Sequence, residues 1–265
     1  MHALLTVREA VRRCTDPLLD RHLLHNQPGP VRDFIDALLG PSQWPFWMDV
    51  PVAAVVGLHH LNFHKRAGPP SWRSAVEDLS ATDWDERVFG YWREELRDKG
   101  FPAAHARRAL RLTSLAGAVV SDNGVHRLAA GVAWLIAECG PGARLRMVRT
   151  TMRHPQDEVV FSRVVAMCAE ARRVDIARLP VAWPAADAPR FAVRVRRDAG
   201  DVSIIDVDLA RGLVARRPQL APWRRRDEAP LTWEELPVGV LQAWQARQWQ
   251  GDALARAERC PTRMD

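Results

Sequence analysis

Residues 124–127 have the sequence Gly-Val-His-Arg, in which a turn residue is followed by side chains that attract an anion. Gly124 permits a tight turn and the close approach of a ligand to the backbone. His126 and Arg127 add hydrogen-bond donors at the same point. The first N–H groups of a helix starting here, together with the helix dipole, also favour a negative charge. The four residues therefore predict a phosphate-binding turn.

The same residues also fit a structural turn. In that interpretation Gly124 is a turn residue, His126 caps a helix and Arg127 makes a surface ion pair. Turns from a strand through glycine into a helix are common, so the residues alone leave both interpretations open.

The segments around the turn predict the elements that position it. Residues 115–120 are an apolar run that predicts a strand, and residues 125–139 have helical spacing that stops at Gly140. The central part of the chain predicts further strands over residues 50–58 and 144–149, and helices over residues 71–79, 87–99, 103–112 and 155–173.

The two ends of the chain predict additional elements. Residues 1–40 predict two short helices. Residues 190–209 alternate around a polar turn and predict a β-hairpin, and the chain continues into a third short strand over 212–215 and a helix over 237–259. We therefore expect an α+β fold in three parts: an N-terminal helical extension (residues 1–49), a core (50–175), and a hairpin with a C-terminal helix (176–265).

This order of elements resembles the ParB/sulfiredoxin superfamily. In that family a strand leads to the motif G-x-[HR]-R at the start of a helix, which here matches Gly124, His126 and Arg127. The strand and helix expected after the motif follow the family's order. Upstream, Asn62 and Arg66 resemble the family's early asparagine and arginine box, so the resemblance covers residues 50–173.

The resemblance implies a ParB/sulfiredoxin-like core that binds ATP or CTP, with Mg²⁺ as a further cofactor. By position, Gly124, His126 and Arg127 would contact the nucleotide phosphates, and Asn62 and Arg66 would be a second set. Family activities include CTP-dependent DNA clamps, sulfiredoxin, DNA nucleases and plasmid proteins that block conjugative transfer. Sulfiredoxins have a cysteine at the position of Val125, so their chemistry is not expected here.

The charge of the chain favours an anionic partner. The formal net charge is +6, and of 38 basic residues only Lys65 and Lys99 are lysines. Arginine binds phosphate in a bidentate manner. The expected nucleic-acid or partner contacts are the run Arg224, Arg225 and Arg226 and the aromatic Trp244.

Two functions are compatible with these features. The first is a nucleotide-binding protein of a plasmid or other mobile element that acts on DNA and hydrolyses the nucleotide or cleaves DNA. The alternative is a non-enzymatic interaction protein, such as a fertility-inhibition factor that blocks conjugative DNA transfer by binding the coupling ATPase of a secretion system. Tryptophan and arginine are enriched at binding hot spots.

Metal sites are weaker alternatives, and no metal site is predicted. His59, His60 and His64 have a spacing that could bind a metal, and two acidic groups around residues 83–86 and 94–98 could hold Mg²⁺. The four cysteines are far apart and are expected to be reduced. Without a secretory signal or a membrane-spanning run, the expected location is the cytoplasm, with no membrane insertion.

Overall fold

The computed structural model describes residues 3–25, 28–58, 70–80, 83–104, 106, 108–180, 189–198, 200–217 and 231–261. Helices and two sheets are both present, which confirms the α+β class. The chain forms two compact units, each built from separate stretches of sequence. Unit 1 comprises residues Met1–Asn26, Ser42–Arg153 and Gln242–Asp265, and unit 2 comprises Gln27–Pro41 and His154–Leu241. The ParB/sulfiredoxin-like core and the three expected domains stay predictions.

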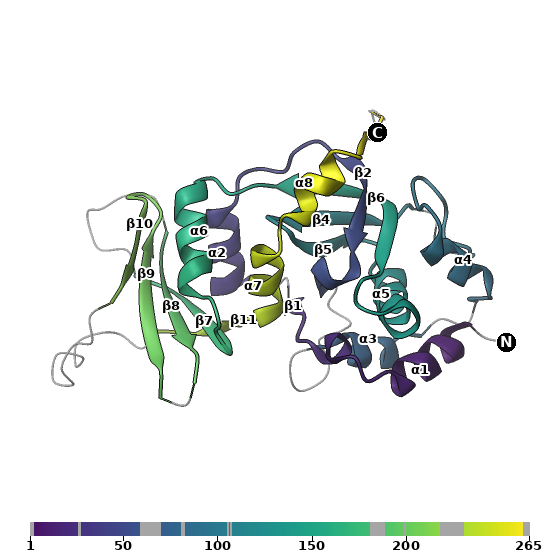
Figure 1. Ribbon diagram of the computed structural model, residues 1–265, viewed down its shortest axis with the longest axis horizontal. Coiled ribbons are helices and arrows are strands. Elements are labelled where there is room, and N and C mark those ends of the chain that lie inside the picture. Colours follow the sequence, from purple (N-terminus) through teal and green to yellow (C-terminus); the bar gives the residue numbers. More distant parts are fainter. Residues whose placement is uncertain are drawn as a thin grey trace. The chain divides into compact units, whose positions relative to one another are not determined.

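Unit 1 is built on a sheet with the strand order β1-β3-β5-β4-β6-β2-β12 (Figure 1). Strand β5 pairs antiparallel with β4 and parallel with β3, and β6 pairs parallel with β4. The strands are β1 (Leu24–His25), β2 (Phe46–Pro51), β3 (Val55–Leu58), β4 (Arg111–Leu115), β5 (Ala118–Asn123), β6 (Arg144–Arg153) and β12 (Glu258–Arg259). The helices are α1 (Ala3–Arg13), α3 (Trp72–Glu77), α4 (Arg87–Arg93), α5 (Val125–Cys139) and α8 (Trp249–Leu254), with 3-10 turns at Pro17–Asp20 and Val52–Ala54.

Helix α5 is the centre of the unit 1 core. It is apolar on nearly all sides, and its buried positions run without a break from Arg127 to Ile136. A helix of this composition must be surrounded by other elements, and α5 contacts α1, α3, α4 and the sheet (Figure 1). Gly131 lies on its α4 side, where the ring of Trp92 takes the space that a Cβ would occupy. Packing along most of α5 therefore fixes the position of its first turn.

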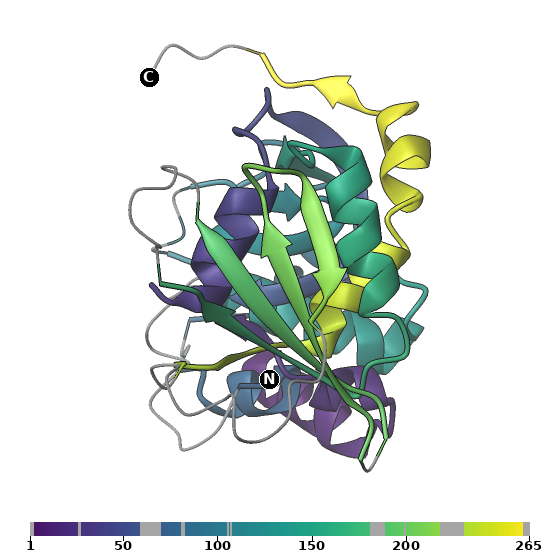
Figure 2. The ribbon, with the colours of Figure 1, turned by 90° about the vertical axis from the view of Figure 1, so that its left-hand side faces the viewer.

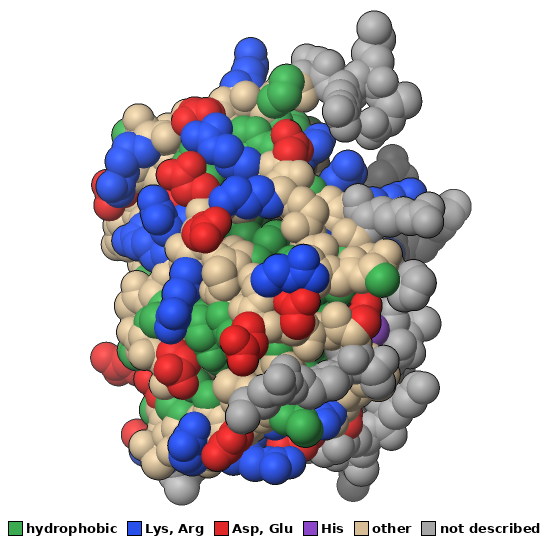
Figure 3. Space-filling model, turned by 90° about the vertical axis from the view of Figure 1, so that its right-hand side faces the viewer, with side chains coloured by type: hydrophobic (Ala, Val, Ile, Leu, Met, Phe, Trp, Pro, Cys, Tyr) green, Lys and Arg blue, Asp and Glu red, His purple; other side chains and the backbone are tan. Residues whose placement is uncertain are grey.

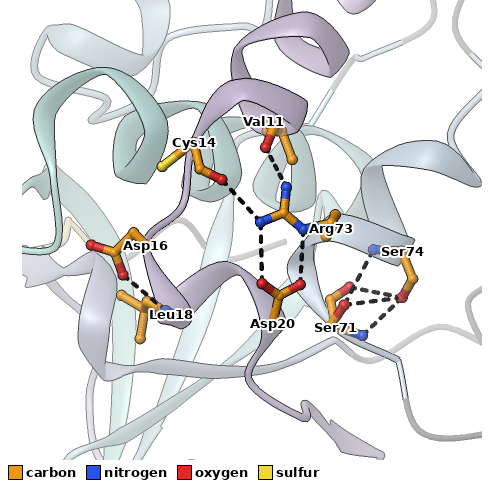
Figure 4. A network of polar contacts seen from close by, with 8 residues as sticks. All are labelled: Val11, Cys14, Asp16, Leu18, Asp20, Ser71, Arg73 and Ser74. Carbon is orange, nitrogen blue, oxygen red and sulfur yellow. Dashed lines mark hydrogen bonds and ion pairs between the residues drawn. The ribbon is translucent and has the colours of Figure 1, made fainter.

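Arg73 joins the N-terminal helices of unit 1 (Figure 4). Its guanidinium donates to the carbonyl oxygens of Val11 and Cys14 at the end of α1, and to the Asp20 carboxylate at 2.8 Å. The last carbonyls of a helix have no partner within the helix. One side chain of α3 thus completes the end of α1 and holds the 3-10 turn after it.

Unit 2 is a single antiparallel sheet in the order β10-β9-β8-β7-β11, with α2 and α6 on one face (Figure 2). In β8 the residues Phe191, Val193 and Val195 are buried, and Phe34 of α2 packs edge-on against Phe191 with 5.2 Å between ring centres. The elements are α2 (Pro30–Leu38), α6 (Glu158–Met167), β7 (Arg173–Arg178), β8 (Arg190–Arg196), β9 (Val202–Asp208), β10 (Leu213–Arg216) and β11 (Glu234–Leu236). Helix α7 (Val238–Gln245) carries the chain from unit 2 back into unit 1.

Five expected elements are corrected by the structure, the first being the helix over 87–99, which ends at Arg93. The run 50–58 is two strands separated by a 3-10 turn, because Pro51 cannot donate to a ladder. Residues 103–112 were expected to be helical, but β4 begins at Arg111, where pairing with β5 and β6 overrides helix propensity. The helix over 155–173 is shortened to α6, and its last residue instead opens β7. The tail over 237–259 divides into α7, α8 and β12.

None of the described helices is both long and apolar enough to span a membrane.

Candidate phosphate site at the start of helix α5

Gly124 makes the turn between β5 and α5. Its backbone has φ 81° and ψ 34°, the left-handed conformation that glycine adopts at little cost. A Cβ at this position would also fall on the guanidinium of Arg127, with Cζ only 2.9 Å away. Two independent requirements, the dihedral angle and the close approach of Arg127, therefore select glycine here.

Helix α5 begins at Val125, as the sequence predicted. The bond from the Leu128 N–H to the Gly124 carbonyl, at 2.9 Å, closes the first turn. The N–H groups of the three residues before Leu128 precede that bond and have no partner within the helix. No side chain caps this N-terminus, so the backbone supplies donors and a positive dipole end where an anion would bind.

Arg127 places a buried positive charge at the same helix end. Its side chain leaves the residue only 6% exposed, and Nη2 donates to the Arg108 carbonyl oxygen. The guanidinium lies over the ring of Phe101, with 5.9 Å from Cζ to the ring centre. The Tyr91 hydroxyl interacts with the guanidinium. Among the described residues, the buried Nη1 has no partner at good hydrogen-bond geometry, and no carboxylate pairs with Arg127. Within the described part of the chain, the site therefore contains a cation without a counter-ion.

Burial lowers the pKa of Arg127 below its usual value, and the nearby Tyr91 opposes this shift. Burial likewise raises the pKa of Tyr91, with Arg127 acting against it. Both shifts have the same cause, the removal of a charged form from water. A bound anion would favour the charged guanidinium and would also offset its repulsion from the positive end of α5.

The surrounding residues fix the Arg127 side chain in position. Asn123, the last residue of β5, donates from Nδ2 to the Ala109 carbonyl oxygen at 3.2 Å and so holds the segment that carries the Arg108 carbonyl. Phe101 lies beneath the guanidinium and packs against Tyr91 of α4 at 5.1 Å between ring centres. His126, in contrast, is exposed. The predicted trio thus divides into a turn, an inner cation and an outer imidazole.

Of the other nucleotide and nucleic-acid residues expected from the sequence, Trp244 is the one that the structure describes. Asn62, Arg66 and the run Arg224, Arg225 and Arg226 lie outside the described residues. Trp244 is 1% exposed and donates from its indole nitrogen to the Leu115 carbonyl oxygen at 2.8 Å, so it is a core residue of unit 1. Its burial does not fit the predicted contact with a partner.

Acidic residues that were considered as Mg²⁺ ligands make other contacts. Asp85 pairs with Arg87 at 2.6 Å, and Glu94 pairs with Lys99 at 2.9 Å. His59, His60 and His64 lie outside the described residues. Among the residues that are described, no three His, Cys, Asp or Glu side chains form a group that could hold a metal ion.

Sequence reasoning did not find Tyr91, Phe101 or the Arg108 carbonyl as parts of the site. They come from segments 19 or more residues before Arg127, and no local pattern connects them with it. The one available signal is the buried position of Arg127 on a helix that is otherwise apolar, which calls for polar partners from elsewhere in the fold.

Comparison with known proteins gives no match among family models, curated proteins or solved structures.

Proposed function

We propose that the chain binds a nucleotide, ATP or CTP, through its phosphates at the start of α5, and that it acts on DNA as a ParB/sulfiredoxin-like protein of a plasmid or other mobile element. The observation that carries the nucleotide site is Arg127, a buried guanidinium with an unpartnered Nη1 beside the uncapped N-terminus of α5. Its action on DNA is taken from the family resemblance.

Each part of the site would have a separate role. Gly124 leaves room for the Arg127 guanidinium beside the turn, and the first N–H groups of α5 would donate to the phosphate oxygens. Arg127 supplies charge from beneath, and the exposed His126 donates from outside. Mg²⁺ would accompany the phosphates. The proposed reaction is hydrolysis of the nucleotide or cleavage of DNA. No general base is assigned.

A second function has support from the same residue. The bond from Arg127 to the Arg108 carbonyl and its packing on Phe101 also suit a purely structural guanidinium. In that case the chain is a non-enzymatic interaction protein, such as a fertility-inhibition factor that binds the coupling ATPase of a secretion system.

Isothermal titration calorimetry with ATP and with CTP, with and without Mg²⁺, tests the first function. The variants are Arg127→Met, which keeps most of the side-chain volume, and His126→Ala, which changes an exposed residue. Loss of one charge-assisted hydrogen bond should weaken binding roughly 10- to 150-fold. Arg13→Ala, a change at an exposed residue of α1, is the control and should bind like the wild type.

Each outcome separates the two functions. Binding that is lost in Arg127→Met and reduced in His126→Ala, with circular dichroism showing folded variants, supports the nucleotide site. Wild-type protein that binds neither nucleotide refutes it. The second function then predicts that wild-type protein and Arg127→Met inhibit conjugative transfer equally well in donor cells.

A further inference from the structure

A buried carboxylate in unit 2 holds several arginines on one face of the sheet. Asp175 of β7 is 1% exposed, and its oxygens lie 2.8 Å from Nε of Arg173, 2.9 Å from Nε of Arg194 and 3.7 Å from Nε of Arg196. These four residues are called the Asp175 cluster below. A carboxylate buried to this extent needs partners. The three arginines supply more positive charge than is needed to neutralise Asp175.

The cluster lies on the face of the sheet that α2 and α6 do not cover. Successive strand residues point to opposite faces, so the apolar Val193 and Val195 face the helices while Arg194 and Arg196 face the other way. The strand register places Asp175 opposite Arg194 and Arg173 opposite Arg196. Figure 2 shows this face toward the viewer, with both helices behind the strands.

The charges of the cluster do not cancel. Three guanidiniums meet Asp175 and one further carboxylate, Glu235, which lies 3.3 Å from Arg173. The neighbouring arginines of the face are also paired: Arg190 shares Asp208 with Arg211, and Arg217 pairs with Asp206. Counted over the residues that the structure describes, the cluster together with Glu235 therefore carries one net positive charge.

The geometry leaves the outer ends of two guanidiniums available. Arg194 and Arg196 meet Asp175 through Nε, and no hydrogen bond from their Nη atoms to another described residue is present. Arg194 also lies on the ring of Trp233, with 4.4 Å from Cζ to the ring centre. The side chain of Arg196 is 44% exposed. Asp175 and Trp233 thus fix the direction of the Arg194 guanidinium, whereas Arg196 is attracted to Asp175 at a longer distance without a hydrogen bond.

We infer that the Asp175 cluster binds the phosphodiester backbone of DNA, with Arg194 and Arg196 as the phosphate contacts. This inference rests on the proposed action on DNA. Two guanidinium N–H groups match two phosphate oxygens, and the Arg194 guanidinium, which is already held in place, loses less entropy on binding. Arg194 and Arg196 are two residues apart in a strand, so they lie on the same face about 6.7 Å apart.

The surface of unit 1 in Figure 3 provides a contrast. Basic and acidic side chains are interspersed over that face, and the described residues there form no continuous basic area. Paired surface charges attract a polyanion weakly because each acid repels the phosphate that its arginine attracts. The Asp175 cluster differs because its central carboxylate is buried beneath the arginines.

Salt dependence of DNA binding tests the inference. Fluorescence anisotropy with a labelled duplex and a labelled single strand, measured between about 50 and 200 mM salt, gives the slope of log K against log salt. Each lost phosphate contact should reduce the slope by about 0.9 on duplex and about 0.7 on single strand. Arg194→Ala/Arg196→Ala should therefore lose about two contacts, and Arg196→Gln about one.

Arg196→Gln guards against misfolding, because its Nε makes no hydrogen bond and Asp175 keeps both closer partners. The matched control is Arg13→Ala/Arg87→Ala, which removes the same charge as the double variant from exposed residues of unit 1. Wild-type protein without DNA affinity, a slope unchanged in Arg196→Gln, or an equal loss in the control each overturns the inference. A difference between duplex and single strand identifies which source of phosphodiester is preferred.

Nucleotide titrations of the same proteins separate this inference from the nucleotide site. Arg196→Gln should bind nucleotide like the wild type, because the cluster and the start of α5 belong to different units. DNA binding that depends on Arg196 in a protein that binds no nucleotide would refute the α5 site and leave the cluster supported. Nucleotide binding without DNA binding would do the reverse.

Discussion

Replacing Gly124 with alanine should destabilise unit 1 by more than its backbone angle alone explains. A non-glycine residue in the left-handed conformation costs about 1–2 kcal/mol. The new methyl would also occupy the place of the Arg127 guanidinium, which must move and give up its bond to the Arg108 carbonyl. A hydrogen bond from a charged group contributes about 1.5–3 kcal/mol. The expected loss in the free energy of unfolding is therefore about 2.5–5 kcal/mol.

A double-mutant cycle isolates the part that comes from Arg127. In an Arg127→Ala background the methyl meets no guanidinium, so Gly124→Ala should cost only about 1–2 kcal/mol. Gly212→Ala is the matched control: its φ is 61°, and a Cβ there would meet its neighbours at the ordinary distances of 3.8 and 4.0 Å. Urea unfolding followed by tryptophan fluorescence measures all four changes. Equal costs of Gly124→Ala in both backgrounds would show that Arg127 does not pack on this turn.

Three further predictions follow from contacts described above. Arg73→Met removes the bonds to Val11 and Cys14 and the ion pair with Asp20, so it should lower the free energy of unfolding by about 2–4 kcal/mol. The hydrogen bond from Arg73 lowers the pKa of Asp20 in the folded state, so that stabilisation is present above about pH 4 and is lost on acidification below it. The variant should therefore lose less stability than the wild type between about pH 4 and pH 2 in acid titrations followed by circular dichroism, and parallel curves would contradict the pairing. Gly131→Ala should be destabilising in urea unfolding although alanine favours helices, because a Cβ at residue 131 would clash with the ring of Trp92; a stabilised variant would show that the ring moves away freely. In labelling with a thiol reagent at pH 8, Cys139 should react in the native protein because it is exposed, whereas Cys168 should react only after unfolding, because burial raises its pKa to about 12; rapid native labelling of Cys168 would contradict its burial.

Glycine and turn residues at the ends of apolar runs explain which elements could be predicted from the sequence. Helix α5 was predicted with the bounds that the structure shows, because glycines stand on both sides of an apolar run of helical length. Strands β8 and β9 were predicted because their residues alternate on either side of a turn. Strand β4 was missed because the segment before it contains alanine and arginine, which favour a helix, and only pairing with β5 and β6 makes it extended.

The candidate site was predictable in part for the same reason. Gly124 and Arg127 stand in one local pattern, and the structure places them in contact. Arg127 is buried and contacts Arg108 and Phe101 because a segment distant in the sequence packs against it. A local sequence pattern does not contain this information. Asp175 was missed because the expected helix over 155–173 ran into the start of β7, although an acid inside an apolar alternating strand is itself unusual.

Because unit 1 is assembled from three stretches of chain, synthesis itself imposes an order on its folding. The hairpin of β4 and β5 is completed by the last stretch, in which Trp249 donates to the Gly117 carbonyl, 132 residues earlier in the chain. At typical translation rates of about 5–20 residues per second, the hairpin waits roughly 7–26 seconds for this partner. The longer stretch of unit 2, His154–Leu241, is synthesised in that interval, and the shorter one, Gln27–Pro41, has already been made. The sheet of unit 2 can therefore form while the β4–β5 hairpin of unit 1 still lacks the partner that covers it. A nascent chain at this stage is the form most in need of a chaperone.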